Sequence, residues 1–236
     1  MSTQIWQSLL RSSMFVLLGA AVAWTQSPDT AAQKPGIKAV ADRPYADFRD
    51  YGAVAAGGAD DTPAANRAIN ALTTNGGLIR FANSIPSFWM KLTAPLDLSN
   101  KAHYTLEGPG AGAGLAYCGD GSGPVINMDR GYYHTLRNFS IFGHWGKFCT
   151  QTPATAGILW DRAKPGNWNA SGLYVDRVWI AGAPQNDIRT PNFTCVDISP
   201  VSQVNAEDAK IYNVVCNPSG GVGFHIGPSP NPKNEV

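Results

Sequence analysis

The sequence has few charged residues, and neither sign of charge is concentrated in any part of it. Lysine, arginine, aspartate and glutamate make up 15% of the 236 residues, and the formal net charge is +1. Binding to nucleic-acid phosphates requires concentrated lysine and arginine, and no basic cluster is present. The composition therefore argues against nucleic acid as a partner.

Hydrophobic runs long enough to span a bilayer are also missing. The apolar run from Met14 to Val22 is too short, whereas Arg11 before it and the small residues at its end are typical of a secretory signal peptide over residues 1–23. A membrane anchor is the alternative interpretation. We expect a secreted or periplasmic protein with no stable membrane span after signal removal.

The four cysteines all follow the signal segment, which favours an oxidising compartment. Neither a Cys-x-x-Cys motif nor a close pairing of cysteine with histidine occurs, so the sequence gives no zinc site. We expect no metal and no other cofactor.

The chain is rich in turn residues placed between short apolar runs. Of its residues, 44% are apolar, and 25 glycines and 17 prolines separate short runs of valine, isoleucine, leucine and phenylalanine. This texture favours many short strands over a helical bundle. We expect a flexible lead-in over residues 24–44, one domain over 45–227 and an irregular tail over 228–236. A domain that is truncated at its C-terminus is the alternative interpretation.

Two series of strand-like runs recur along the domain. Taking Leu106, Phe139, Val178 and Val214 as equivalent gives steps of 33, 39 and 36 residues. A second series through Val125, Ile158, Val196 and Phe224 has steps of 33, 38 and 28 residues. Interleaved periods of this length predict an all-β solenoid, in which each coil carries at least two strands and stacks on the one before it.

The alternation within these runs predicts which side chains point inward. Phe139 and Ile141, Val178 and Ile180, and Val214 and Cys216 should face the interior, and Ser140, Trp179 and Val215 the exterior. The loops after the first strand type should project from one shared edge; they are expected at residues 107–123, 142–156, 181–193 and 217–222.

A capped amphipathic helix is predicted near the start of the domain. Thr62 can serve as its N-cap with Pro63 at the first helical position, and Ala65, Ile69 and Leu72 form one apolar stripe. Such a helix needs an apolar surface to cover, so we expect it to close the N-terminal end of the solenoid.

The same region resembles a known family. The segments that carry the resemblance are Asp47-Phe48, Tyr51-Gly52-Ala53-Val54, Asp60-Asp61-Thr62, Gly76-Gly77 with the strand Leu78-Ile79-Arg80-Phe81, and Thr105-Leu106-Glu107-Gly108-Pro109-Gly110. Together they are similar to the N-terminal segment of the pectate-lyase-like superfamily. The resemblance implies a right-handed parallel β-helix, here of about four to five coils with an N-terminal capping α-helix. It does not specify the reaction, because lyases, glycoside hydrolases, epimerases and phage tailspikes share this segment.

Proteins of this superfamily usually act on polysaccharide, through carboxylates and, for acidic sugars, through lysine or arginine. The polygalacturonase signature is absent, because Asp60-Asp61 belongs to the helix cap and Gly143-His144-Trp145 lacks a second glycine. The shared loop edge instead offers Asp120, Asp187 and His144 as candidate catalytic residues, and Trp145, Lys147 and Arg189 as candidate substrate-binding residues. Ordinary solvated loop residues are the alternative for each of them.

The repeat also bears on the cysteines. Cys118 and Cys149 fall in equivalent loops of adjacent coils, which makes them candidate disulfide partners. Cys216 falls in the inward column of Ile141 and Ile180, so we expect a small buried hydrophobic residue there rather than a bond to Cys195.

Two functions remain open from the sequence. The first is a secreted polysaccharide-active protein, a lyase or a glycoside hydrolase if it is active, that cleaves or binds an acidic polysaccharide. The second is a non-catalytic or truncated glycan-binding module, including a tailspike-like trimeric receptor-binding protein. No second capping helix is apparent, so an uncapped C-terminal coil would favour homo-oligomers.

Overall fold

A computed structural model describes residues 45–55, 58–72, 76–81, 88–145, 149, 152–160, 170–183, 190–199 and 206–227. The expected signal peptide, lead-in and tail lie outside these ranges. Within them, no helix combines the length and the apolar character needed to cross a membrane.

The described chain is mostly β-structure with one α-helix and one short 3₁₀ helix. The elements are β1 (Tyr45–Asp47), η1 (Phe48–Tyr51), α1 (Thr62–Ala71), β2 (Gly77–Arg80), β3 (Trp89–Leu92), β4 (Leu96–Asp97), β5 (Tyr104–Glu107), β6 (Gly114–Tyr117), β7 (Ile126–Met128), β8 (His134–Phe142), β9 (Ala156–Trp160), β10 (Ala170–Ser171), β11 (Leu173–Ala181), β12 (Thr194–Ile198), β13 (Ala206–Glu207), β14 (Lys210–Tyr212), β15 (Val215–Asn217) and β16 (Val222–Ile226).

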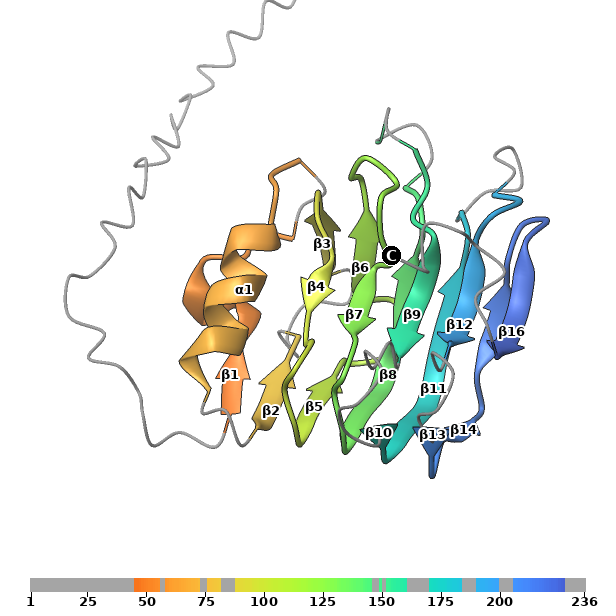
Figure 1. Ribbon diagram of the computed structural model, residues 1–236. Coiled ribbons are helices and arrows are strands. Elements are labelled where there is room, and N and C mark those ends of the chain that lie inside the picture. The colour runs from red at the N-terminus through yellow and green to blue at the C-terminus, as the bar shows by residue number, and fades with distance from the viewer. Residues whose placement is uncertain are drawn as a thin grey trace, which may run out of the picture. The chain divides into compact units, whose positions relative to one another are not determined.

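The strands form parallel sheets in which chain order is also spatial order. A nine-stranded sheet runs β1-β2-β5-β8-β11-β14 and also contains β3, β6 and β15, and a five-stranded sheet runs β4-β7-β9-β12-β16. The strands β10 and β13 form a separate pair, and every strand pairing among the described residues is parallel. Figure 1 shows the strands following one another from α1 at one end to β16 at the other.

The inward side chains form apolar columns across the repeats. Phe139 pairs with Val178, and Ile141 pairs with Ile180, which in turn pairs with Cys216. Tyr212 on β14 pairs with Asp176, and Val215 on β15 pairs with Trp179. Val214, one residue before Val215, therefore lies beside Val178. The predicted interior row of the first series is therefore confirmed from Phe139 onward. Burying each large side chain in it is worth about 1.5–3 kcal/mol.

Three details of the predicted repeat were wrong. Leu106 pairs with Leu136 and not with Phe139, and it is Ile126, not Val125, that pairs with Ile158. The predicted loop 107–123 contains the strand β6, which pairs with the second half of β8. The first and the third share a cause: β8 is one continuous strand, whereas the preceding repeat divides the same span between β5 and β6.

The predicted outward residues behave differently along their row. Trp179 and Val215 are exposed, at 38% and 60%, but Ser140 is buried. The Ser140 hydroxyl donates a hydrogen bond to the Ala111 carbonyl oxygen at 2.9 Å, because the chain between β5 and β6 passes over it. Ser140 therefore points outward in the row of Trp179, as predicted, but it is covered by the chain between β5 and β6 instead of being exposed to solvent.

The helix α1 packs as its apolar stripe predicts. Ala65, Ile69 and Leu72 are buried, and the Tyr104 hydroxyl donates a hydrogen bond to the Ile69 carbonyl at 3.3 Å. The helix begins at Thr62, with Asp61 at the N-cap position. Asp60 accepts from the Thr62 backbone N–H at 3.0 Å, so the capping role expected of Thr62 is performed from two residues earlier.

Two disulfides connect neighbouring repeats. Cys118 is bonded to Cys149, the pair suggested by their equivalent loops. Cys195 is bonded to Cys216, so the expectation of an unbonded Cys216 was wrong. Cys216 does lie in the inward column of Ile180, but Cys195 on β12 also points inward, and the two sulfur atoms meet in the interior between the two sheets.

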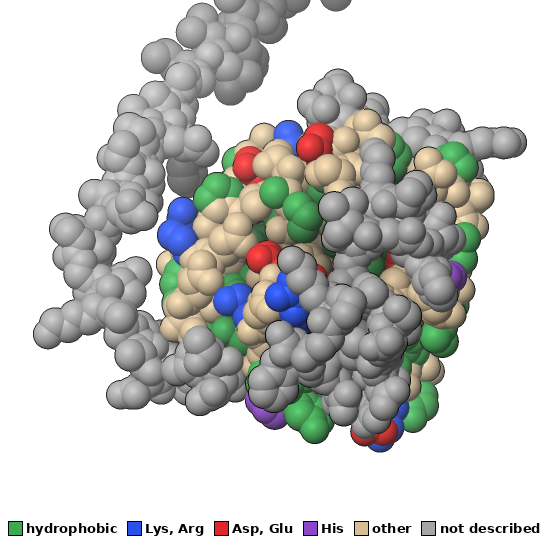
Figure 2. All heavy atoms as spheres, in the orientation of Figure 1, with side chains coloured by type: hydrophobic (Ala, Val, Ile, Leu, Met, Phe, Trp, Pro, Cys, Tyr) green, Lys and Arg blue, Asp and Glu red, His purple; other side chains and the backbone are tan. Residues whose placement is uncertain are grey.

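The C-terminal end of the described domain leaves its interior column exposed. Val222, Phe224 and Ile226 are 39%, 49% and 76% exposed, whereas their partners in β12 are at most 2% exposed. Figure 2 shows hydrophobic side chains at the edge of the molecule where β16 lies in Figure 1.

Opposite charges alternate across the outer face of the large sheet. Neighbouring repeats place Arg80, Glu107, Arg137 and Asp176 in one row. Glu107 lies between two arginines, 3.6 Å from the Arg80 side chain and 3.2 Å from that of Arg137. The row therefore favours this register, because a slip by one repeat would place like charges in contact.

We expect Glu107→Gln to lower the free energy of unfolding by about 1 kcal/mol at low ionic strength, because two half-exposed arginines would lose the charge between them. Urea unfolding at low salt and at about 1 M salt checks this, since screening should remove most of the difference. An equal loss at both salt concentrations would contradict an electrostatic role.

Candidate functional site

Aromatic rings from three strands gather on the outer face of the large sheet. They belong to Trp89 on β3, Phe142 on β8, Trp179 on β11 and Trp145, which follows β8. Trp89 stacks on Phe142 with ring centroids 4.6 Å apart, and Trp145 meets Trp89 edge-on at 4.7 Å. Trp179 meets Phe142 edge-on at 5.8 Å. We call these four residues the aromatic surface.

The strand register explains why the rings fit together. Trp89 pairs with Gly114, which pairs with Ser140, so two small residues separate Trp89 from Trp179 in one outward row. In the next outward row Phe142 lies between Ala116 and Ala181. A Cβ atom at Gly114 would lie 1.9 Å from the Ser140 carbonyl oxygen, so this position requires glycine. Large rings thus alternate with small neighbours.

The aromatic surface is partly buried and partly exposed. Phe142 is nearly buried, Trp89 and Trp145 are half-buried, and Trp179 is 38% exposed. Tryptophan rings arranged in this way offer a rigid apolar face with a polar N–H at its rim. The surface can therefore stack flat ligands that carry both apolar faces and hydrogen-bonding groups.

Only some of the residues predicted for the shared loop edge lie at the aromatic surface. Trp145 belongs to the aromatic surface, and His144 beside it is buried. Asp187, Lys147 and Arg189 lie outside the described residues. Trp89 and Phe142 were missed, although the outward position of Phe142, one alternation beyond Ser140, was the signal that could have identified it.

Asp120 has the geometry of a turn residue. Its carboxylate accepts from the Ser122 backbone N–H at 2.8 Å and from the Tyr117 hydroxyl at 3.3 Å. The hydrogen bonds from Ser122 lower the pKa of this carboxyl below its usual value. A general acid at neutral pH needs the opposite shift, so the described contacts of Asp120 favour a structural role.

A cluster of polar side chains lies on the outer face of the five-stranded sheet. The buried carboxylate of Asp197 is 3.0 Å from His225 Nδ1 on β16 and accepts a short hydrogen bond from the Ser199 hydroxyl. Because His225 and Ser199 both bond to the carboxylate, this is not the relay of nucleophile, base and acid found in hydrolase triads. It ties β16 to β12.

Among the described residues, no group of three or more histidine, cysteine, aspartate or glutamate side chains is arranged to hold a metal ion. Trp160 is fully buried and donates its indole N–H to the Gly131 carbonyl at 3.0 Å, so its ring is not available to a ligand.

Comparison with known proteins gives little further information. No family model matches the chain, and no curated protein matches it. Among solved structures, the ORF18 protein of Geobacillus virus E2 is similar over 78% of this chain, with 16% sequence identity and a TM-score of 0.45. This chain spans 41% of the length of that protein.

Proposed function

We propose that the protein is an exported, pectate-lyase-like right-handed parallel β-helix that binds polysaccharide on its aromatic surface. The parallel register repeated across both sheets supports the β-helix, since crossover connections between parallel strands are almost always right-handed. Two disulfides among the described residues support export to an oxidising compartment.

The observation that carries the binding proposal is the exposed Trp179 ring beside three packed aromatic rings. The apolar faces of sugar rings stack on aromatic rings, and their hydroxyl groups find hydrogen-bond partners at the ring edges. Contiguous exposed aromatic patches on soluble proteins commonly mark such contact sites. Binding without cleavage is the form we favour, because the described contacts of Asp120 suit a turn.

We expect Trp179→Ala to weaken polysaccharide binding about tenfold, the loss of roughly one stacking contact of about 1.4 kcal/mol. Calorimetric titration with oligogalacturonate and with a neutral β-linked glucan checks this. Val215→Ala is the matched control, because Val215 is exposed in the same outward row beside Trp179 but is aliphatic.

Unchanged affinity of Trp179→Ala would contradict the proposed surface, and wild-type protein that binds neither glycan would contradict the function. The same samples are followed for ultraviolet-absorbing unsaturated products and for reducing ends. Release of either product by wild-type protein would replace binding by cleavage as the function.

A further inference from the structure

A second aromatic group lies at the opposite end of β8, where the chain enters the large sheet. His103 stacks on Tyr133 with ring centroids 5.0 Å apart and an interplanar angle of 11°. Tyr132 meets both rings edge-on, at 5.9 Å from His103 and 5.8 Å from Tyr133. We call these three residues the corner cluster.

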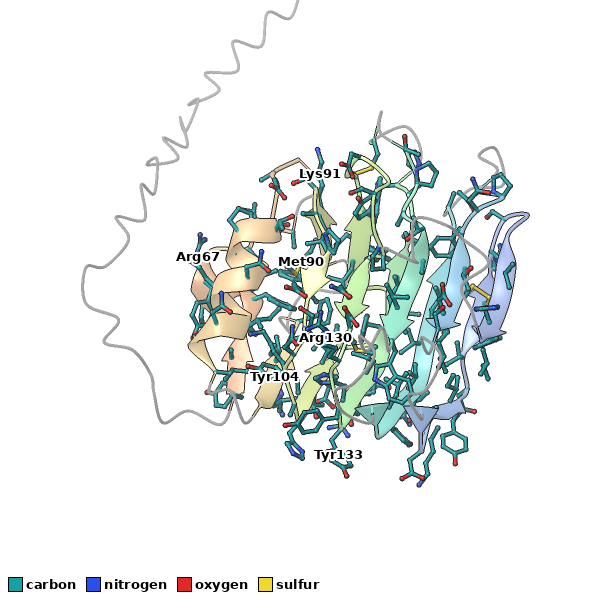
Figure 3. The ribbon with its side chains drawn as sticks, in the orientation of Figure 1. Arg67, Met90, Lys91, Tyr104, Arg130 and Tyr133 are labelled. Carbon is teal, nitrogen blue, oxygen red and sulfur yellow. A yellow bond between two sulfur atoms is a disulfide. The ribbon has the colours of Figure 1, made fainter. Side chains whose placement is uncertain are left out.

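The corner cluster is exposed to solvent. Tyr132 is 42% and Tyr133 52% exposed, and His103 is also exposed. Figure 3 shows Tyr133 at the lower ends of the strands, projecting away from the ribbon, and Figure 2 shows a histidine beside hydrophobic side chains at the same edge.

The backbone at Tyr133 is unfavourable for the residue that occupies it. The chain enters β2, β5, β8, β11 and β14 of the large sheet through one left-handed residue each; these are Gly76, His103, Tyr133, Gly172 and Asp208, with φ of 95°, 60°, 56°, 77° and 61°. Glycine and aspartate suit this conformation, whereas a bulky side chain costs about 1–2 kcal/mol. Histidine is among the residues enriched in this conformation, so the cost falls on Tyr133, where a smaller residue would be more stable.

The neighbouring turns leave room around the rings. Gly172 follows Tyr133 in this column, and a Cβ atom there would lie 2.4 Å from the Tyr133 ring. Tyr133 can lie over this turn only because Gly172 has no side chain. A glycine also precedes His103 in the column, so no side chain from Gly76 covers His103 from that side. The stacked rings of His103 and Tyr133 therefore lie between two glycines in this column.

From exposure, stacking and backbone strain together, we propose that the corner cluster is a second sugar-stacking site, which binds pyranose rings of the polysaccharide that the aromatic surface binds. This proposal rests on the proposed function. A strained residue such as Tyr133 that persists in an exposed position is expected where the strain serves binding. The stacked His103 and Tyr133 rings offer flat faces, and the Tyr132 and Tyr133 hydroxyls can hydrogen-bond to sugar hydroxyl groups.

The test uses Tyr133→Asn, because asparagine tolerates the left-handed conformation better than tyrosine. We expect this variant to bind long oligosaccharides of the two glycan types about tenfold more weakly while its melting temperature stays equal or rises. His103→Asn should behave in the same way. Tyr212→Ser is the control, since Tyr212 is an exposed tyrosine on β14 that contacts Tyr174 and lies outside the cluster.

The outcomes separate the two proposals. Full binding by Tyr133→Asn together with weakened binding by Trp179→Ala overturns the corner site and leaves the proposed function in place. A lowered melting temperature with unchanged affinity shows that the cluster only supports the fold, which also overturns the corner site. Wild-type protein that binds neither glycan overturns both. Weakening for oligogalacturonate alone, or for the neutral glucan alone, identifies the sugar that the cluster accepts.

Discussion

Replacing Cys195 and Cys216 together by alanine should lower the free energy of unfolding by about 3 kcal/mol, the loop-closure value for a crosslink that spans 21 residues. The bond crosses the interior between β12 and β15, which joins the last repeat to the one before it. We expect the double variant to lose stability mainly in residues 210–227.

The last repeat should respond locally because little else covers it. Its interior side chains on β16 are 39% to 76% exposed, so they contribute less burial than their partners in β12. Segments with few buried contacts open below the global unfolding free energy. The contacts that remain include the strand pairing of β14, β15 and β16, the Asp197–His225 pair and the hydrogen bond from the Asn213 amide to Asp176.

Hydrogen exchange followed by mass spectrometry measures this directly. Amides of residues 210–227 should exchange much faster in the double variant, while those of β8 keep their protection. The control is the Cys118→Ala/Cys149→Ala variant, which removes a crosslink spanning 31 residues and should also cost about 3–4 kcal/mol without exposing β16. Unchanged protection of residues 210–227 after loss of the Cys195–Cys216 bond would contradict a local role.

The sequence allowed the repeat and the N-terminal helix to be predicted because both depend on short-range periodicity. Alternation placed Phe139, Val178 and Ile180 inward, and the spacing of Ala65, Ile69 and Leu72 placed one face of α1 on the interior. These patterns are properties of one strand or one helix, and each of them is visible within about ten residues.

Register and the contacts between repeats could not be predicted in the same way. Leu106 was aligned three residues from its true partner Leu136 because the chain between β5 and β6 has no counterpart in β8. The Cys195–Cys216 bond joins strands of different sheets, and a single-strand pattern does not give the distance between sheets.

The candidate site was predicted in part for a related reason. Trp145 was singled out from its loop, but the rings of Trp89 and Phe142 that pack against it come from two other repeats. The left-handed turn at Tyr133 was also missed, since tyrosine is a residue that sequence patterns rarely assign to positive φ.

Acid should destabilise the fold through His134, which the sequence did not single out. Its side chain faces the interior in the column of Tyr104 and Leu173, and only 1% of the residue is exposed. The pKa of the imidazole is lowered from 6.5 to about 4, chiefly by burial and to a smaller extent by nearby His103, while hydrogen bonds with the backbone of Tyr104 and Lys101 act in the opposite direction.

The direction of the pH effect follows from the pKa of His134, which is 6.5 in the unfolded chain and about 4 in the folded protein. As pH falls below 6.5 the unfolded chain binds a proton at this position and the folded chain does not, so the unfolded state is favoured. The contribution of His134 is therefore complete above pH 6.5 and is lost progressively down to about pH 4. A pKa difference of this size corresponds to about 3 kcal/mol in full, of which about 2 kcal/mol is lost at pH 5.

Urea unfolding of wild-type protein and of His134→Leu at pH 7.5 and pH 5 tests this assignment. Leucine is the matched replacement, because Leu173 occupies the same column in the next repeat. We expect wild-type protein to lose about 2 kcal/mol more than the variant between the two pH values. His103→Asn, which removes an exposed histidine and with it only the smallest cause of the His134 shift, should keep most of the wild-type dependence. An equal loss in wild-type protein and in His134→Leu would show that other groups cause the acid sensitivity, and His134 would then have no part in it.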